Sequence, residues 1–433
     1  MPKKIIWTCK RGFTVLGLKN NTLSPGVNKL PGRFYQQIIE HVFRPMTIGR
    51  LTMELPGGAL RIYGSGSRGP EAMMRIHSND FFRKCVLYGD VGFGESYVDG
   101  DWDSDDVTKV IEWMIVNVEN NPVLMADKPK RSPVNFLKIF NKVQHALRAN
   151  TKQGSRKNIS DHYDLGNDFF RLFLDPTMAY SSAYFRNSKE TLHEAQINKF
   201  DLLCQKLKLR ARDHVLEIGG GWGGLALHAA RNYGCKVTTI TISQEQFSYM
   251  ERKVKEEDLN GYVDVKLTDY RDVQGKFDKI VSVEMIEAVG HKFLKEYFTQ
   301  CHALLKKDGL LALQMILAPD HRYDSFRKNV DWIQKHIFPG SLLPSLNVIQ
   351  RSLRQTGQLM LHDYEDMTPS YARTLNMWRE NFNRNLESVR ELGFSEEFIR
   401  KWNYYKSYCE AAFKTRNISV VQAVFTRPNN LAL

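Results

Sequence analysis

The sequence lacks several features that would each point to a particular class of protein. Its six cysteines form no C-x-x-C pair, so neither a disulfide framework nor a zinc site is indicated. No apolar run approaches the ~20 residues of a membrane-spanning helix, and Lys10 and Arg11 interrupt the N-terminal region before a signal core can develop. Internal repeats and low-complexity segments are also missing. We therefore expect a cytoplasmic protein that does not cross a membrane.

The composition is that of a globular protein with a basic surface. Its 433 residues predict two or three domains, and 42% hydrophobic with 25% charged residues argues against disorder. The 61 Lys and Arg residues outnumber the 48 Asp and Glu residues, which gives a net charge of +13. This excess favours a polyanionic partner, either nucleic acid or an anionic bilayer surface. A solvated basic surface without a partner is the alternative.

The first part of the chain differs in pattern from the rest. Residues 1–116 alternate short apolar stretches with Gly and Pro, which predicts a smaller α+β domain. Residues 117–158 form a linker with one candidate amphipathic helix, whose apolar face carries Phe136, Ile139, Phe140, Val143 and Leu147. Such a basic helix can rest on an anionic membrane, or it can dock onto its own protein.

The rest of the chain, residues 159–433, contains strands that alternate with helices. The expected strands are HVLEIG, KVTTITI, VDVKLTDY, FDKIVSVEMI (277–286) and GLLALQMI (309–316), and KFLKEYFTQCHALLKK (292–307) is expected to be a helix. This alternation predicts an α/β, doubly wound, Rossmann-like domain with a parallel sheet. Ligands of such sheets bind at the carboxyl ends of the strands, near the switch point.

A glycine-rich turn follows the first of these strands, in VLEIGGGWGG (215–224). Such a turn is shared by NAD, FAD and S-adenosylmethionine proteins. A dinucleotide enzyme should offer an acid at the end of the second strand, but that end carries ITISQEQ instead. Glu217 stands before the glycines, where methyltransferases of this topology keep a carboxylate, and Trp222 suits a pyrophosphate cradle poorly. The turn therefore favours S-adenosylmethionine.

Several motifs between residues 155 and 430 point together to one family. They are ISDHYDLGNDFFRLFLDPTMAYSSAYF, VLEIGGGWGGLA, TISQEQ, TDYRD, VEMIEAVGH, HIFPGSLLPS and YARTLNMW. In this order they resemble the cyclopropane-fatty-acyl-phospholipid synthase family of S-adenosylmethionine-dependent methyltransferases, most closely the EMIEAVGH branch that includes plant-type synthases. The stretch KCVLYGDVGFGESYVDGDWDSDD (84–106) is similar to the smaller domain that precedes the catalytic domain in many of these enzymes.

The resemblance implies an activity, a substrate and a location. Methyl transfer to the cis double bond of an unsaturated phospholipid acyl chain would give a carbocation, and loss of a proton to bound bicarbonate would close a cyclopropane ring. It also implies a lipid-binding N-terminal domain, a peripheral position at the inner membrane surface and a homodimer. It implies neither a metal nor a nucleic-acid partner.

The resemblance also assigns the residues around the bicarbonate. The glutamate corresponds to Glu287, the tyrosine to Tyr371 and the backbone N–H to Ile316. Ser182 stands where relatives keep a cysteine, and Gln314 where many keep a histidine. Both side chains can donate to an anion, but neither titrates near neutral pH. If the anion were held poorly, the cation could lose a different proton and give a methyl-branched unsaturated chain.

Cofactor contacts follow from the same matching. Tyr180 and Ser181 would contact the methionine moiety of S-adenosylmethionine, and Gly219, Gly221 and Trp222 would line the glycine turn. Thr241 and Gln246 would contact the ribose, and Tyr270 and Arg271 would flank the adenine. Ser181 and Ser182 are not expected to be nucleophiles, because no G-x-S-x-G elbow accompanies them.

Two other classes of function remain open at this point. Small-molecule N-methyltransferases of the coclaurine type share the catalytic fold, although they do not need the basic N-terminal unit or the amphipathic linker. A lipid-transfer or scaffolding protein with an inactive catalytic domain would explain Ser182 and Gln314, although it would be expected to lose the glycine turn or Glu287.

Overall fold

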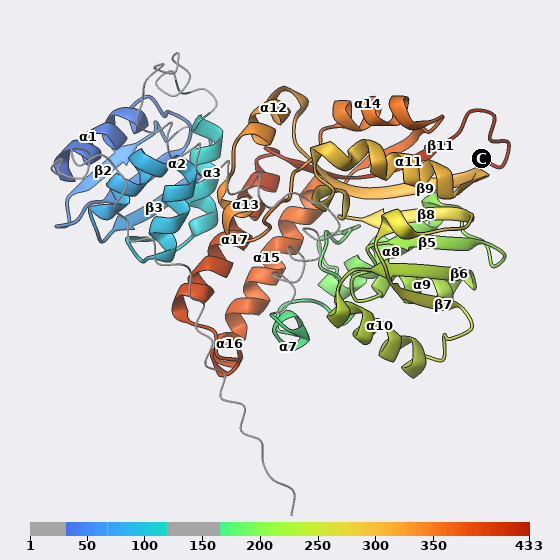
Figure 1. Cartoon of the computed structure of the whole chain (residues 1–433). Helices are drawn as coiled ribbons and strands as arrows, with labels where there is room; N and C mark the ends of the chain where they lie inside the picture. Colours follow the sequence, from blue (N-terminus) through green and yellow to red (C-terminus); the bar gives the residue numbers. More distant parts are fainter. Residues whose placement is uncertain (1–31, 67, 119–120, 122–164) are drawn as a thin grey trace, which may run out of the picture.

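The computed structural model describes residues 32–66, 68–118, 121 and 165–433. The expected linker helix around residues 136–147 lies outside these ranges. The N-terminal part is an α+β unit with a four-stranded sheet of order β2-β1-β3-β4 (Figure 1). Its elements are α1 (Gly32–Phe43), β1 (Arg50–Glu54), β2 (Leu60–Tyr63), β3 (Glu71–Ile76), α2 (Asp80–Val98), β4 (Trp102–Asp103) and α3 (Val107–Val118).

The larger part is built on a seven-stranded sheet of order β10-β11-β9-β8-β5-β6-β7. Its strands are β5 (His214–Ile218), β6 (Lys236–Thr241), β7 (Val263–Leu267), β8 (Phe277–Val283), β9 (Leu305–Leu317), β10 (Met360–Asp366) and β11 (Ser419–Thr426). The strands from β9 to β7 are parallel, as the sequence predicts, whereas β11 runs antiparallel to β9 and to β10. Because β5 has β6 on one side and β8 on the other, the connection order reverses at β5, which makes this the switch point.

The helices of this part cover both faces of the sheet and also form a layer toward the N-terminal unit. They are α7 (Asn167–Arg171), α8 (Leu192–Lys206), α9 (Gly224–Tyr233), α10 (Gln244–Glu256), α11 (Leu294–Leu304), α12 (Asp320–Lys328), α13 (Trp332–His336), α14 (Leu346–Thr356), α15 (Thr368–Arg384), α16 (Leu386–Glu391) and α17 (Glu396–Lys414). Three short 3-10 turns are η2 (Tyr270–Asp272), η3 (Ile286–Ala288) and η4 (His291–Phe293).

Alternate strand residues enter two different cores. Val215, for example, belongs to the core under α8, α9 and α10, and its neighbour Leu216 belongs to the core under α11 and α14. This period of two is expected for a sheet covered on both faces. The doubly wound Rossmann-like fold is therefore confirmed.

Three expected elements run well past their observed ends. The strand VDVKLTDY ends at Leu267, before the 3-10 turn at Tyr270, and the other two ends have a cause in the local backbone. The strand expected over 277–286 ends at Val283, because Glu284 has a left-handed backbone (φ 48°) and its N–H donates to the Gln314 carbonyl over 2.7 Å. The helix expected over 292–307 ends at Leu304, because Leu305 already pairs with Phe277 of β8. The correction at Glu284 lies at the cavity described below, because Glu284 lines it, whereas Leu305 lies at the other, amino end of β9.

The N-terminal unit packs tightly against the catalytic part, with α13, α15 and α17 between the two sheets (Figure 1). Helix α17 packs on α2 and α3, and its Arg400 donates to the carbonyls of Tyr97 and Trp102 and pairs with Asp103. The cores of the two parts merge into one apolar cluster. Within the described ranges no helix is long and apolar enough to cross a bilayer.

Candidate active site

A cavity of about 360 Å³ opens at the carboxyl ends of β5, β6, β8 and β9, where the fold predicts a ligand. Helices α15 and α17 and the loop 338–343 complete its wall. Of the fourteen site residues expected from the sequence, twelve line the cavity: Tyr180, Ser181, Gly219, Gly221, Trp222, Thr241, Gln246, Tyr270, Arg271, Glu287, Ile316 and Tyr371. The other two, Ser182 and Gln314, are buried behind its wall, with 0% and 1% of their surface exposed.

The glycine turn forms an open cradle on one side of the cavity. Gly219 and Gly220 both donate to the Ile240 carbonyl over 3.0 Å, which fixes the turn against β6. Gly221 has φ +56°, and a Cβ added there would meet no atom within 4 Å. Trp222 is held beside it, because its Nε1–H donates to Asn167 Oδ1 over 2.6 Å and its ring packs on Phe170. This free space over exposed backbone fits a bound nucleoside cofactor.

The positions expected at the ribose and the adenine contact one another in pairs. Thr241 Oγ1 donates to Gln246 Oε1 over 2.8 Å at the end of β6. Arg271 forms a 2.7 Å ion pair with Asp269, and its guanidinium lies 5.2 Å from the centre of the Tyr270 ring. Asp269 also lines the cavity. Asp269 was not predicted as a site residue, although its place at the end of the expected strand VDVKLTDY could have indicated it.

A buried lysine lies at the expected methionine end. The Nζ of Lys199 donates to Ser181 Oγ over 2.7 Å, and burial lowers the pKa of Lys199 to about 8. Nearby, burial raises the pKa of Glu217 to about 7, and Glu217 accepts a 2.6 Å hydrogen bond from Thr239. No sequence signal distinguishes Lys199 from Lys206, the other lysine of α8. Together with the cradle at Gly221, these residues fit S-adenosylmethionine.

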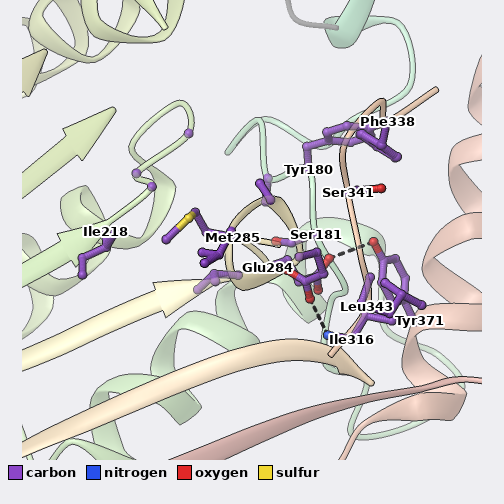
Figure 2. A pocket seen from close by; sticks show the side chains of 18 of the residues that line it. Tyr180, Ser181, Ile218, Glu284, Met285, Ile316, Phe338, Ser341, Leu343 and Tyr371 are labelled. Atoms are coloured by element: carbon purple, nitrogen blue, oxygen red, sulfur yellow. Dashed lines mark hydrogen bonds between the residues drawn. The ribbon is translucent and has the colours of Figure 1, made fainter. Parts of the chain in front are cut away.

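Glu284 also lines the cavity and accepts three hydrogen bonds. The Ser182 N–H and Gln314 Nε2 each donate to its Oε1 over 2.8 Å, and the Tyr371 hydroxyl donates to its Oε2 over 2.8 Å. Figure 2 shows Tyr371 and Glu284 pointing toward one another. The sequence analysis missed Glu284, although it stands three residues before Glu287 in VEMIEAVGH.

The groups around Glu284 are themselves fixed. Gln314 and Gln422 are opposite residues on β9 and β11, and Gln422 Nε2 donates to Gln314 Oε1 over 3.0 Å, which orients the Gln314 amide toward Glu284. The hydroxyl of Ser182, expected from the sequence to face an anion, instead donates to the Ala183 carbonyl over 2.9 Å. Only the backbone N–H of Ser182 reaches a carboxylate.

Holding Glu284 in this position has a cost. A left-handed backbone costs a residue with a Cβ about 1–2 kcal/mol, and burial raises the pKa of the Glu284 carboxyl. Hydrogen bonds from Gln314 and Ser182 and the charge of Lys199 oppose that rise. Backbone strain at a polar residue that lines a cavity is typical of a functional site.

Glu287 is less well satisfied than Glu284. Its Oε1 accepts from the Ile316 N–H over 2.5 Å, the second hydrogen bond drawn in Figure 2, whereas its buried Oε2 has no hydrogen-bond partner among the described residues. Burial and then the neighbouring charge of Glu284 raise the pKa of Glu287 to about 8. At neutral pH this carboxyl is therefore protonated.

This shift predicts a specific dependence of stability on pH. Between the ordinary pKa of 4.5 and the raised value of about 8, the folded protein binds one proton more than the unfolded chain. The free energy of unfolding therefore falls by up to about 1.4 kcal/mol per pH unit as the pH rises through this range. In Glu287→Gln this contribution disappears. Urea unfolding from pH 5.5 to 8.5 gives the free energy of unfolding of the wild type and of the variant. As the pH rises, the wild type should lose stability relative to the variant. A difference in free energy that does not change with pH would contradict the raised pKa of Glu287.

The rest of the cavity wall is apolar and rich in aromatic rings. Tyr371 stacks on Phe413 with ring centres 4.4 Å apart, and the hydroxyls of Tyr180 and Tyr405 lie 3.0 Å from one another. Ring faces in a dry site stabilise positive charge. The site therefore combines a cofactor cradle, two carboxyl groups and an electron-rich apolar wall, which suits chemistry through a carbocation at an apolar substrate.

Comparison with known proteins gives matches over most of the chain. Residues 150–423 match the family model described as mycolic acid cyclopropane synthetase. Tuberculostearic acid methyltransferase UfaA1 of Mycobacterium tuberculosis is 37% identical over 84% of this chain and 85% of its own length. Cyclopropane-fatty-acyl-phospholipid synthase of Escherichia coli K12 is 37% identical over 82% of this chain and 88% of its own length.

A solved structure gives the same result. The mycolic acid cyclopropane synthase CmaA1, complexed with SAH and CTAB, superimposes with a TM-score of 0.58 at 31% identity, over 63% of this chain and 98% of its own. SAH is what S-adenosylmethionine becomes after it has given up its methyl group. The preference for S-adenosylmethionine over NAD is thus confirmed.

Proposed function

The chain belongs to the mycolic acid cyclopropane synthetase family of S-adenosylmethionine-dependent methyltransferases, and from this premise we propose that it converts the cis double bond of an unsaturated phospholipid acyl chain into a cyclopropane ring. The observation that carries the proposal is the pair of carboxyl groups, half-buried Glu284 and buried Glu287, facing an aromatic cavity next to the cofactor cradle. An alkene offers neither charge nor hydrogen bonds, and this apolar wall suits it.

The cavity residues have distinct roles in this proposal. When bound, S-adenosylmethionine supplies an electrophilic methyl group on a positively charged sulfur. Gly221, Thr241 and Gln246 hold the cofactor, and the apolar wall excludes water from the acyl chain. The faces of Tyr371 and Phe413 stabilise the positive charge that develops on that chain, by about 1–2 kcal/mol for each desolvated ring. The final proton loss needs a base in the cavity.

The substrate is proposed to reach the site from a membrane surface. The net charge of +13 favours anionic phospholipid. The N-terminal unit packs on α17, which forms part of the cavity wall, and would hold the lipid beside it. We propose that the enzyme is a peripheral protein at the inner membrane surface.

A second product is favoured by one comparison. The 37% identical UfaA1 is named a tuberculostearic acid methyltransferase, so methyl transfer without ring closure is an alternative outcome of the same first step. In that case the chain would lose a proton from a carbon other than the transferred methyl and keep a double bond.

Lipid analysis separates these possibilities. We expect phospholipid from a host that expresses the enzyme to gain one CH₂ per modified chain and to lose the alkene. If the chain gains one CH₂ but keeps the alkene, the product is a methyl-branched unsaturated chain. Purified enzyme is then given radiolabelled S-adenosylmethionine with vesicles of unsaturated phosphatidylglycerol or with soluble amines. Label found only in amines would refute the proposal, and Gly221→Leu serves as the control without cofactor binding.

A further inference from the structure

The donors that the family resemblance assigns to bicarbonate are already occupied in this chain. Ser182, Gln314 and Tyr371 were each expected to face a bound anion, and all three donate to the carboxylate of Glu284 over 2.8 Å. They do so from three distant parts of the sequence, at residues 182, 314 and 371. The carboxylate of Glu284 thus takes the place of the expected small anion.

Bicarbonate does not fit these residues. Glu284 lines the cavity, whereas Ser182 and Gln314 lie behind it with almost no exposed surface. An anion in the cavity could not reach these two donors without displacing the Glu284 side chain. It would also lie against a carboxylate, which repels it. The Ile316 N–H, another expected donor, is taken by Glu287.

The arrangement also differs from that of a carboxylate that only ties elements together. Glu284 lines the same cavity as the cofactor cradle. Its backbone has a left-handed conformation, which normally favours glycine. Its two oxygens accept from a main-chain N–H, an amide oriented by Gln422 and a tyrosine. These neutral donors favour the charged form, so the side chain remains a carboxylate, the form that can accept a proton.

Resting on the function proposed above, we propose that the Glu284 carboxylate is the general base of the reaction and that this enzyme works without bicarbonate. The π electrons of the alkene form a bond to the methyl carbon as its bond to sulfur breaks, which leaves a positive charge on the second alkene carbon. Glu284 then takes a proton from the new methyl group. The electron pair of that C–H bond closes the ring on the cationic carbon, and the proton on Glu284 passes to water after the product leaves.

The test compares the wild type with two variants in buffer freed of carbon dioxide and in buffer with added bicarbonate. We expect the wild-type rate to be the same within about twofold in both buffers. Glu284→Gln keeps the shape but not the base, and its rate should fall by about 100-fold or more, as for loss of a general base. Glu284→Gly relieves the backbone and opens space for an anion, so bicarbonate or formate should raise its low rate about tenfold or more.

Two further measurements test whether the variants lose activity only because the base is missing. They are the affinity for the cofactor product and the rate of a matched variant. The affinity of each variant for S-adenosylhomocysteine, measured by calorimetry, should stay within about threefold of the wild type, because the cradle lies on the other strands. Glu365→Gln is the matched control, since Glu365 also accepts from a tyrosine hydroxyl, that of Tyr184, but lies outside the cavity wall. Its rate should equal that of the wild type.

Two results would overturn the inference: a wild-type rate that falls more than tenfold when bicarbonate is removed, or a Glu284→Gln variant that keeps more than a tenth of the wild-type rate. Neither would refute the proposed function, because lipid would still be modified. Failure of the wild type to modify any lipid would instead refute the proposed function itself.

Discussion

Replacing Gly221 with leucine should abolish cofactor binding and leave the fold intact. The backbone at Gly221 has φ +56°, and a Cβ there would enter open space in the cavity rather than collide with the protein. The new side chain would therefore fill the cradle. We expect the affinity for S-adenosylhomocysteine, measured by calorimetry, to fall more than about 100-fold, which corresponds to about 3 kcal/mol, with loss of all methyl transfer.

A matched control separates backbone strain from blocked binding. Gly234 ends α9 with φ +64°, lies outside the cavity wall, and would give its Cβ only an ordinary 3.6 Å contact with Ala211. Gly234→Leu should therefore carry a similar backbone cost of about 1–2 kcal/mol and bind the cofactor as the wild type does. Equal losses of affinity in both variants, or an unchanged affinity in Gly221→Leu, would show that the cradle is not where the cofactor lies.

The contrast between Gly221 and Glu284 shows which parts of such a site the sequence can predict. The cofactor turn is local: the strand, the glycines and the helix follow one another within about ten residues, so their spacing is enough. The environment of Glu284 is not local. It depends on a left-handed backbone at one residue and on three donors that the fold brings together. The family resemblance predicts that Ser182 and Gln314 lie near one another. It does not predict that both donate hydrogen bonds to Glu284.

Strand β11 explains another part of what was missed. It returns antiparallel beside β9, at the end of the chain, and only its register places Gln422 opposite Gln314. Likewise, nothing in the repeating strand and helix pattern indicates that the N-terminal unit merges with the catalytic core. Long-range register and docking surfaces depend on contacts that no single segment encodes.

The last expected result concerns that docking surface. Gly94 of α2 packs so closely on the catalytic part that a Cβ would lie 2.5 Å from Trp332 Cδ1 and 2.7 Å from Tyr404 Cε1. Both rings are fully buried, so neither can move aside. Gly94→Val should therefore destabilise the protein by about 2–4 kcal/mol, as overpacking of a tight core does. Thermal unfolding followed by tryptophan fluorescence measures this loss.

The same substitution should affect catalysis more than cofactor binding. The residues after Trp332 and Tyr404, namely Ile333 and Tyr405, line the cavity. Displacing α13 or α17 would open that wall to water, and we expect lipid turnover to fall about tenfold while the affinity for S-adenosylhomocysteine stays within about threefold. Gly261→Val is the control, because a Cβ at Gly261 meets nothing within 4 Å. If both variants unfold at the wild-type temperature and keep the wild-type rate, the N-terminal unit does not support the cavity wall through Gly94.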